Sequence, residues 1–179
     1  MASASASTMV KTILYATDLG IYGPYLLEHV SDLAQRHDAR VFVVHAIEPL
    51  SPFADAVLEA FVPEDTRQSL KNQGLDNVLE TIRLRVMAAF EDDFIDFEGS
   101  RDWLADVRVL AGNAPDVILA ESQRIHADLI VIGSHGSHQG HSSFTSIGSV
   151  ASKVLQLSQI PVYLVPTQSK RQSIIGHFG

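Results

Sequence analysis

The strongest constraint on the fold of this chain is a set of five short apolar runs separated by stretches with helical periodicity. Several of these runs are nearly continuous in Val, Ile and Leu and do not alternate with polar residues. Strands buried on both faces have this pattern, which is typical of parallel sheets covered by helices. We therefore predict five parallel strands, at Thr12–Ala16, Val41–Ala46, Asp106–Leu110, Leu129–Ile132 and Val162–Val165.

The stretches between the runs repeat apolar residues at the spacing of amphipathic helices. Helices are predicted over Leu26–Ala34, over Leu75–Phe90, from about Pro115 onward, and over Ile147–Leu155. Proline suits the first helical turn because its missing N–H is not needed there. The alternation predicts a single doubly wound α/β domain with a five-stranded parallel sheet, right-handed crossovers and helices on both faces.

The length of 179 residues fits one domain better than two. We expect that domain to span residues 10–167. Residues 1–9 are rich in Ser and Ala, with no basic region and no long apolar run, and are expected to form a disordered tail or a cloning remnant. Residues 168–179 are expected to form a C-terminal tail.

Charge and cysteine content exclude several classes of function. The 13 basic and 21 acidic residues give a net charge of −8, which leaves no electrostatic footprint for nucleic acid or an anionic membrane. No cysteine is present, so disulfides, thiol catalysis and thiolate metal sites are excluded. No segment has the length of apolar sequence needed to span a bilayer. We expect a cytoplasmic protein with neither a nucleic-acid nor a membrane partner.

The segment best suited to bind a ligand runs from Gly133-Ser134-His135-Gly136 to Gly148-Ser149-Val150. It begins where the fourth strand ends and finishes where the last predicted helix starts. Glycines permit close approach of a ligand and positive φ, and the free N–H groups at a helix start attract phosphate. Ser149 is expected to donate a hydroxyl or to cap the helix. The alternative is an ordinary strand-to-helix loop.

Several motifs in this order resemble the universal stress protein family, over roughly residues 11–166. They are Ile13–Asp18, Val44–Pro49, Gly112–Pro115, Gly133–Gly136 and Gly148–Val150. The resemblance implies an adenine-nucleotide-binding α-hydrolase-like fold with strand order 3-2-1-4-5. In that order the sheet reverses direction between strands 1 and 4, and ligands of open α/β sheets bind at such a switch point.

The resemblance also implies which residues form the nucleotide site. Residues after strand 1 and at the end of strand 2 would hold adenine and ribose, the end of strand 4 would line the cleft, and the start of the last helix would meet the phosphates. Asp18 would accept from a ribose hydroxyl or lie near a phosphate-bound Mg²⁺; its alternative role is to cap a turn. The implied site residues are Ala16, Thr17, Asp18, Ala46, Ile132, Gly133, His135, Gly136, Gly148, Ser149 and Val150.

The glycine loop departs from the family pattern. Nucleotide-binding members carry G-2x-G-9x-G-[S/T], whereas the second gap here, Ser137–Ile147, has eleven residues. The stretch from Ser134 to Ser152 also contains no Lys or Arg. Phosphate would therefore depend on amides, hydroxyls, a divalent ion and histidine. His135, His138 and His141 recur every third residue, but the loop has no carboxylate, and we expect no native metal site there.

Three functions follow as hypotheses. The first is a regulatory stress-response protein that binds ATP or a related adenine nucleotide and is not an enzyme. The second is a nucleotide-free dimeric module that contacts a protein partner, and the third is a weak ATP hydrolase. An apolar edge strand needs cover, and the resemblance implies that Val162–Val165 pairs with its copy in a homodimer.

Overall fold

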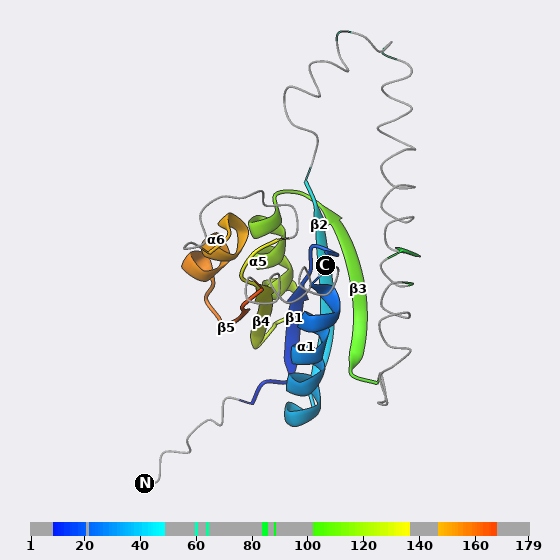
Figure 1. Cartoon of the computed structure of the whole chain (residues 1–179), viewed down its shortest axis with the longest axis vertical. Coiled ribbons are helices and arrows are strands. Elements are labelled where there is room, and N and C mark those ends of the chain that lie inside the picture. Colours follow the sequence, from blue (N-terminus) through cyan, green and yellow to red (C-terminus); the bar gives the residue numbers. More distant parts are fainter. Residues whose placement is uncertain are drawn as a thin grey trace, which may run out of the picture.

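Five parallel strands form one sheet in the order β3-β2-β1-β4-β5 in the computed structural model (Figure 1). The structure describes residues 9–20, 22–48, 102–136 and 147–167, together with five isolated positions at 60, 64, 84, 85 and 88. The predicted strands and the predicted order are confirmed, and β2, β3 and β4 extend slightly beyond the predicted runs. The strands are β1 (Thr12–Ala16), β2 (Arg40–Ile47), β3 (Leu104–Ala111), β4 (Leu129–Gly133) and β5 (Val162–Val165).

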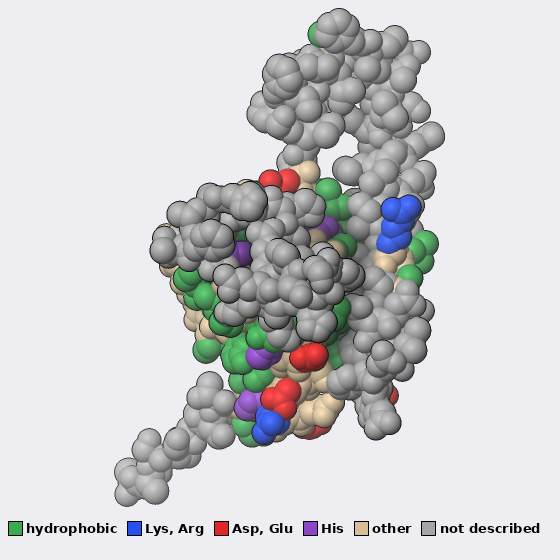
Figure 2. Space-filling model, viewed as in Figure 1, with side chains coloured by type: hydrophobic (Ala, Val, Ile, Leu, Met, Phe, Trp, Pro, Cys, Tyr) green, Lys and Arg blue, Asp and Glu red, His purple; other side chains and the backbone are tan. Residues whose placement is uncertain are grey.

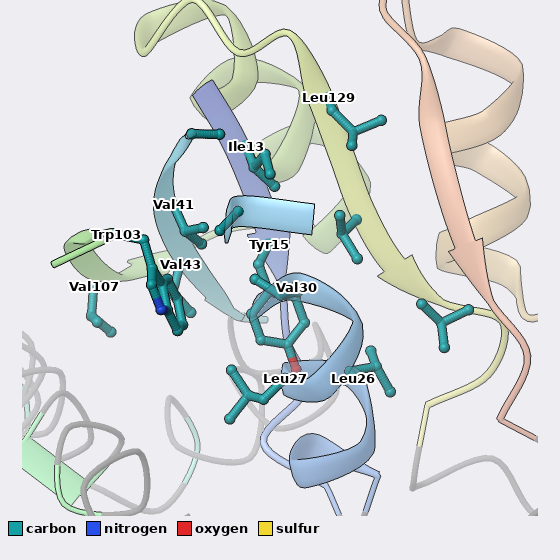
Figure 3. Packing of buried hydrophobic residues seen from close by; sticks show 14 of the residues in the cluster. Ile13, Tyr15, Leu26, Leu27, Val30, Val41, Val43, Trp103, Val107 and Leu129 are labelled. Atoms are coloured by element: carbon teal, nitrogen blue, oxygen red, sulfur yellow. The ribbon is translucent and has the colours of Figure 1, made fainter. Parts of the chain in front are cut away.

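Helices cover both faces of this sheet, as predicted. Helix α1 (Gly23–His37) packs on one face, and helices α5 (Ala114–Arg124) and α6 (Ser149–Leu157) pack on the other. Alternation along β1 shows the division, since Ile13 and Tyr15 belong to the core under α1 while Leu14 and Ala16 belong to the core under α5 and α6. Figure 3 shows Tyr15 directed toward α1, beside Val30.

Local sequence helps to fix the ends of the helices. Pro24 and Pro115 lie in the first turns of α1 and α5, where an N–H is not required. Asp38 ends α1 in the left-handed conformation, with φ 50° and ψ 52°. Of the two alternative roles expected for Ser149, helix capping is contradicted, because Gly148 is the N-cap residue of α6, with a φ of −56°. That cap follows from the chain path, because Gly148 N–H donates to the Ser134 carbonyl at 2.9 Å.

A buried carboxylate ties β3 to α5. Glu121 is 4% exposed and binds Arg108 of β3 at 3.1 Å and Arg124 of its own helix at 2.7 Å. Burial alone would raise the pKa of Glu121, but the hydrogen bonds and positive charges of the two guanidinium groups outweigh burial and hold that pKa below its usual range. The ionised carboxylate is therefore part of the packed structure near neutral pH.

Several expectations fall on parts of the chain that the structure does not describe. The predicted helix Leu75–Phe90 lies outside the described residues except at isolated positions, and so do the two predicted tails except for Met9. No helix within the described ranges has both the length and the apolar character needed to cross a membrane.

Candidate functional site

A cavity of about 430 Å³ opens at the carboxyl ends of β1 and β4, where the strand order reverses. Its volume lies in the range of small-molecule sites. The walls come from the loop after β1, the end of β2, the loop after β4 and the start of α6. All eleven residues predicted from the sequence line this cavity: Ala16, Thr17, Asp18, Ala46, Ile132, Gly133, His135, Gly136, Gly148, Ser149 and Val150.

The loop after β1 forms a tight turn that aims Asp18 at the loop after β4. Thr17 Oγ1 accepts from Leu19 N–H and Asp18 Oδ1 accepts from Gly20 N–H, each at 3.0 Å. Leu19 has a φ of 57°, a left-handed conformation that few bulky residues adopt outside constrained turns. Asp18 therefore has the turn-capping role considered above, and its other oxygen, Oδ2, lies 3.3 Å from where a Cβ on Gly136 would be.

Ser134 joins the loop after β4 to both neighbouring segments. Its N–H donates to the Val165 carbonyl at 2.8 Å, and its carbonyl accepts from Gly148 N–H at 2.9 Å. Its hydroxyl accepts from Thr167 N–H and lies 3.0 Å from His135 Nδ1. The position of the glycine loop is thus determined by the end of β5 and the start of α6, in addition to β4 itself.

Gly133 fits closely against the packing behind this loop. A Cβ added there would lie 3.2 Å from Thr167 Cγ2 and 3.3 Å from Leu26 Cδ2, closer than most real Cβ contacts. The absence of a side chain lets Thr167 and α1 approach the end of β4. Gly133 therefore shapes one wall of the cavity through packing.

His45 at the end of β2 also lines the cavity. Its Nδ1 lies 2.9 Å from the Thr17 carbonyl oxygen, which can only accept, so Nδ1 carries the hydrogen. This bond fixes the tautomer of the neutral ring and links the end of β2 to the loop after β1.

Other lining residues had no functional signal in the sequence. Tyr22 and Leu26 come from the first turns of α1, Ala114 and Ile118 come from α5, and Thr167 follows β5. The residues after each strand of a parallel sheet meet at one edge, which is the rule that would have pointed to Thr167.

The described cavity wall is acidic. Asp18 and Glu48 line it, and no Lys or Arg occurs among its described lining residues. A search of the described residues found no group of three potential metal-ligating His, Cys, Asp or Glu side chains. An anionic ligand would therefore meet backbone N–H groups at the start of α6 and the two histidines His45 and His135. His138 and His141 lie outside the described residues.

These features define a doubly wound α/β protein with a ligand-sized cavity at its switch point. The sequence model of the universal stress protein family matches residues 9–166, which is most of the chain. The chain therefore belongs to the universal stress protein family. No curated protein matches it.

Solved structures agree with the fold at low sequence identity. The hypothetical protein MJ0577, whose structure served to assign its biochemical function, is 22% identical, with a TM-score of 0.60 over 89% of this chain and 97% of that one. A universal stress protein in complex with cAMP is 19% identical, with a TM-score of 0.51 over 88% and 98% of the two chains. Universal stress protein UspA from Lactobacillus plantarum is 19% identical, with a TM-score of 0.54 over 87% and 97%.

Proposed function

We propose that this universal stress protein binds ATP or a related adenine nucleotide in the switch-point cavity and acts as a regulator, not as an enzyme. The observation that carries the proposal is the convergence of eleven residues, predicted from four separate segments, on one cavity of about 430 Å³. The cAMP complex of a structurally similar universal stress protein adds that an adenine nucleotide is a ligand known within this fold family.

The orientation of the nucleotide in this proposal follows the chemistry of the walls. Apolar side chains gather between the end of β2 and α5, where Ala46 and Ile118 line the cavity. In this proposal, adenine binds on this side of the cavity. The phosphates point to the N-terminus of α6, where free N–H groups and the helix dipole favour negative charge. Asp18, which lines the same cavity, would accept from a ribose hydroxyl or, as the alternative, lie near a phosphate-bound Mg²⁺.

A Mg²⁺ ion fits the proposal as a companion of the nucleotide. Asp18 supplies one carboxylate, and among the described residues there is no cluster that would hold a divalent ion without the ligand. Mg²⁺ commonly binds through one or two carboxylates, substrate phosphates and waters. When bound, it would neutralise phosphate charge beside an acidic wall.

The proposal includes a homodimer formed through β5. This strand is at the edge of the described sheet, next to β4 only, and Tyr163 on it is 38% exposed. On the adjacent helix α6, Leu155 and Leu157 are 39% and 53% exposed. Figure 2 shows hydrophobic side chains along the side where β5 and α6 lie. Pairing with a second copy would cover both the strand edge and these side chains.

Mass spectrometry of small molecules released from the denatured purified protein tests the nucleotide proposal. The expected result is an adenine nucleotide in amounts comparable to the protein. Calorimetric titration with ATP, AMP and cAMP then identifies the preferred ligand. If the protein were a nucleotide-free interaction module, no nucleotide would co-purify with it and none would bind in the titration. Steady ADP release above that of an Asp18→Asn variant would favour the weak hydrolase instead.

A further inference from the structure

Thr167 is a buried hydroxyl residue that no part of the proposed function uses. It is 1% exposed and lies two residues beyond the end of β5. Its hydroxyl accepts from His135 N–H at 3.2 Å and donates to the His135 carbonyl at 3.3 Å. Its own N–H donates to Ser134 Oγ at 3.0 Å. Thr167 therefore holds both the backbone and the side chains of the loop after β4.

The same loop faces the cavity. Ser134, His135 and Thr167 all line it. The hydrogen bonds among these three residues therefore connect the wall of the cavity to β5, the strand that precedes Thr167. Since Ser134 N–H also binds the Val165 carbonyl, the loop and the end of β5 are joined at two successive positions. A shift of the loop cannot leave this end of β5 in place without breaking buried hydrogen bonds, which are costly to leave unmade.

We propose that Thr167 couples occupancy of the cavity to self-association through β5. This inference rests on the proposed function, because it needs both a nucleotide in the cavity and a dimer at the edge strand. In this coupling, a ligand that orders the loop Gly133–Gly136 also orders Thr167 and the end of β5. The strand then loses less conformational freedom when it pairs with its copy, so the coupling has a positive sign.

Thermodynamic linkage gives the size and the symmetry of the effect. Coupling free energies between sites commonly correspond to changes of about 5- to 150-fold in affinity. ATP should therefore tighten the dimer by about five-fold or more, and the dimer should bind ATP more tightly than the monomer by the same factor. Agreement between these two factors distinguishes true coupling from separate effects of ATP on solubility or aggregation.

Sedimentation velocity of the full chain over a concentration series, with and without saturating ATP, measures the dimer dissociation constant. The decisive variant is Thr167→Val, which removes the hydroxyl and nearly keeps the shape. With ATP raised until it saturates the variant at whatever affinity the variant retains, we expect an ATP-dependent shift of less than about two-fold, below the range typical of coupled sites. Thr167→Ser keeps the hydroxyl and should retain the coupling.

The matched control is Ser158→Ala. Ser158 Oγ donates to the Ile160 carbonyl at 2.7 Å, just before β5, and does not line the cavity. Ser158 Oγ also accepts from Ile160 N–H at 3.2 Å, so this variant loses two hydroxyl hydrogen bonds near the strand, yet it should keep the wild-type shift. If Thr167→Val fails to fold, Ser134→Ala breaks the same network from the other partner and should show the same loss.

The outcomes separate the inference from the proposed function. Wild-type protein that binds ATP and dimerises with an unchanged dissociation constant would overturn the coupling and leave the proposed function intact. A Thr167→Val variant with the full wild-type shift would overturn the role of Thr167. Absence of ATP binding, or a monomer at all concentrations, would remove the proposed function and the coupling together.

Discussion

Gly112, at the turn from β3 into α5, leaves no room for an added methyl group. Its φ is +149°, a conformation that L-residues rarely adopt, and a Cβ there would lie 2.8 Å from Val117 Cγ2. Carbon atoms pack best about 3.5–4.0 Å apart, so the methyl groups would overlap by about 0.7 Å or more. Unfavourable backbone conformations cost about 1–3 kcal/mol, and overpacking adds about 1–3 kcal/mol.

Gly112→Ala should therefore lower the free energy of unfolding by about 2–6 kcal/mol, a large part of the total of about 5–15 kcal/mol for a typical domain. Urea unfolding followed by circular dichroism measures the loss. A double-mutant cycle separates its causes, because Val117→Ala removes the overlapping methyl and should recover about 1–2 kcal/mol of the penalty. Gly23→Ala is the control, since nothing lies within 4 Å of its added Cβ.

The reasoning would be refuted by a Gly112→Ala protein within about 0.5 kcal/mol of wild type, the range of ordinary surface substitutions. A penalty unchanged by Val117→Ala would place the whole cost in the backbone conformation. The hydrogen bond from Gly112 N–H to the Ile47 carbonyl, at 2.9 Å, keeps the turn in register and limits the backbone movement that could relieve the contact.

Three further predictions concern the cavity, a buried charge and the strand edge. Gly136→Val should stay folded but weaken ATP binding about ten-fold or more, because its branches fill the space beside Asp18 Oδ2; calorimetry with parental affinity would place the ligand elsewhere. Glu121→Gln should cost about 1–3 kcal/mol near neutral pH. Because the folded-state pKa of Glu121 is lowered, its contribution is present above the unfolded pKa of about 4.3 and is lost as pH falls through the folded pKa. Urea titrations at several pH values should show a shallower acid loss in the variant than in wild type. Tyr163→Lys places a charge on the edge strand and should yield monomers in light scattering, whereas an unchanged dimer would exclude β5 from the interface.

The main features of the fold were predictable because they depend on patterns that need no knowledge of distant contacts. The run of Leu, Ile and Val in β4 is short and rich in β-branched residues, which favours a strand buried on both faces over a buried helix. The strand order could not be predicted in this way, because the hydrophobic pattern does not indicate which strands pair. It came from the resemblance carried by the motifs after β1 and β4.

The features that the sequence did not predict depend on partners far apart in the chain. Glu121 lies on the buried face of α5, and its acceptability there depends on Arg108, which belongs to β3. Thr167 is an ordinary loop residue in the sequence, and only the fold brings its hydroxyl to His135. Capping was one of the two roles considered for Ser149, since serine is a common cap, but the chain path makes Gly148 the cap of α6.

The strand order also explains why a ligand site and an association edge should communicate in this protein. In the order β3-β2-β1-β4-β5, the switch point lies between β1 and β4, and β4 has the edge strand β5 as its other neighbour. The loop after β4 is therefore in contact with both the cavity and the strand that is proposed to pair. The opposite edge, β3, is separated from the switch point by β2 and β1. Topology thus allows coupling at the β5 edge, and the Ser134–Thr167 hydrogen bonds supply the chemical link between the loop after β4 and the end of β5.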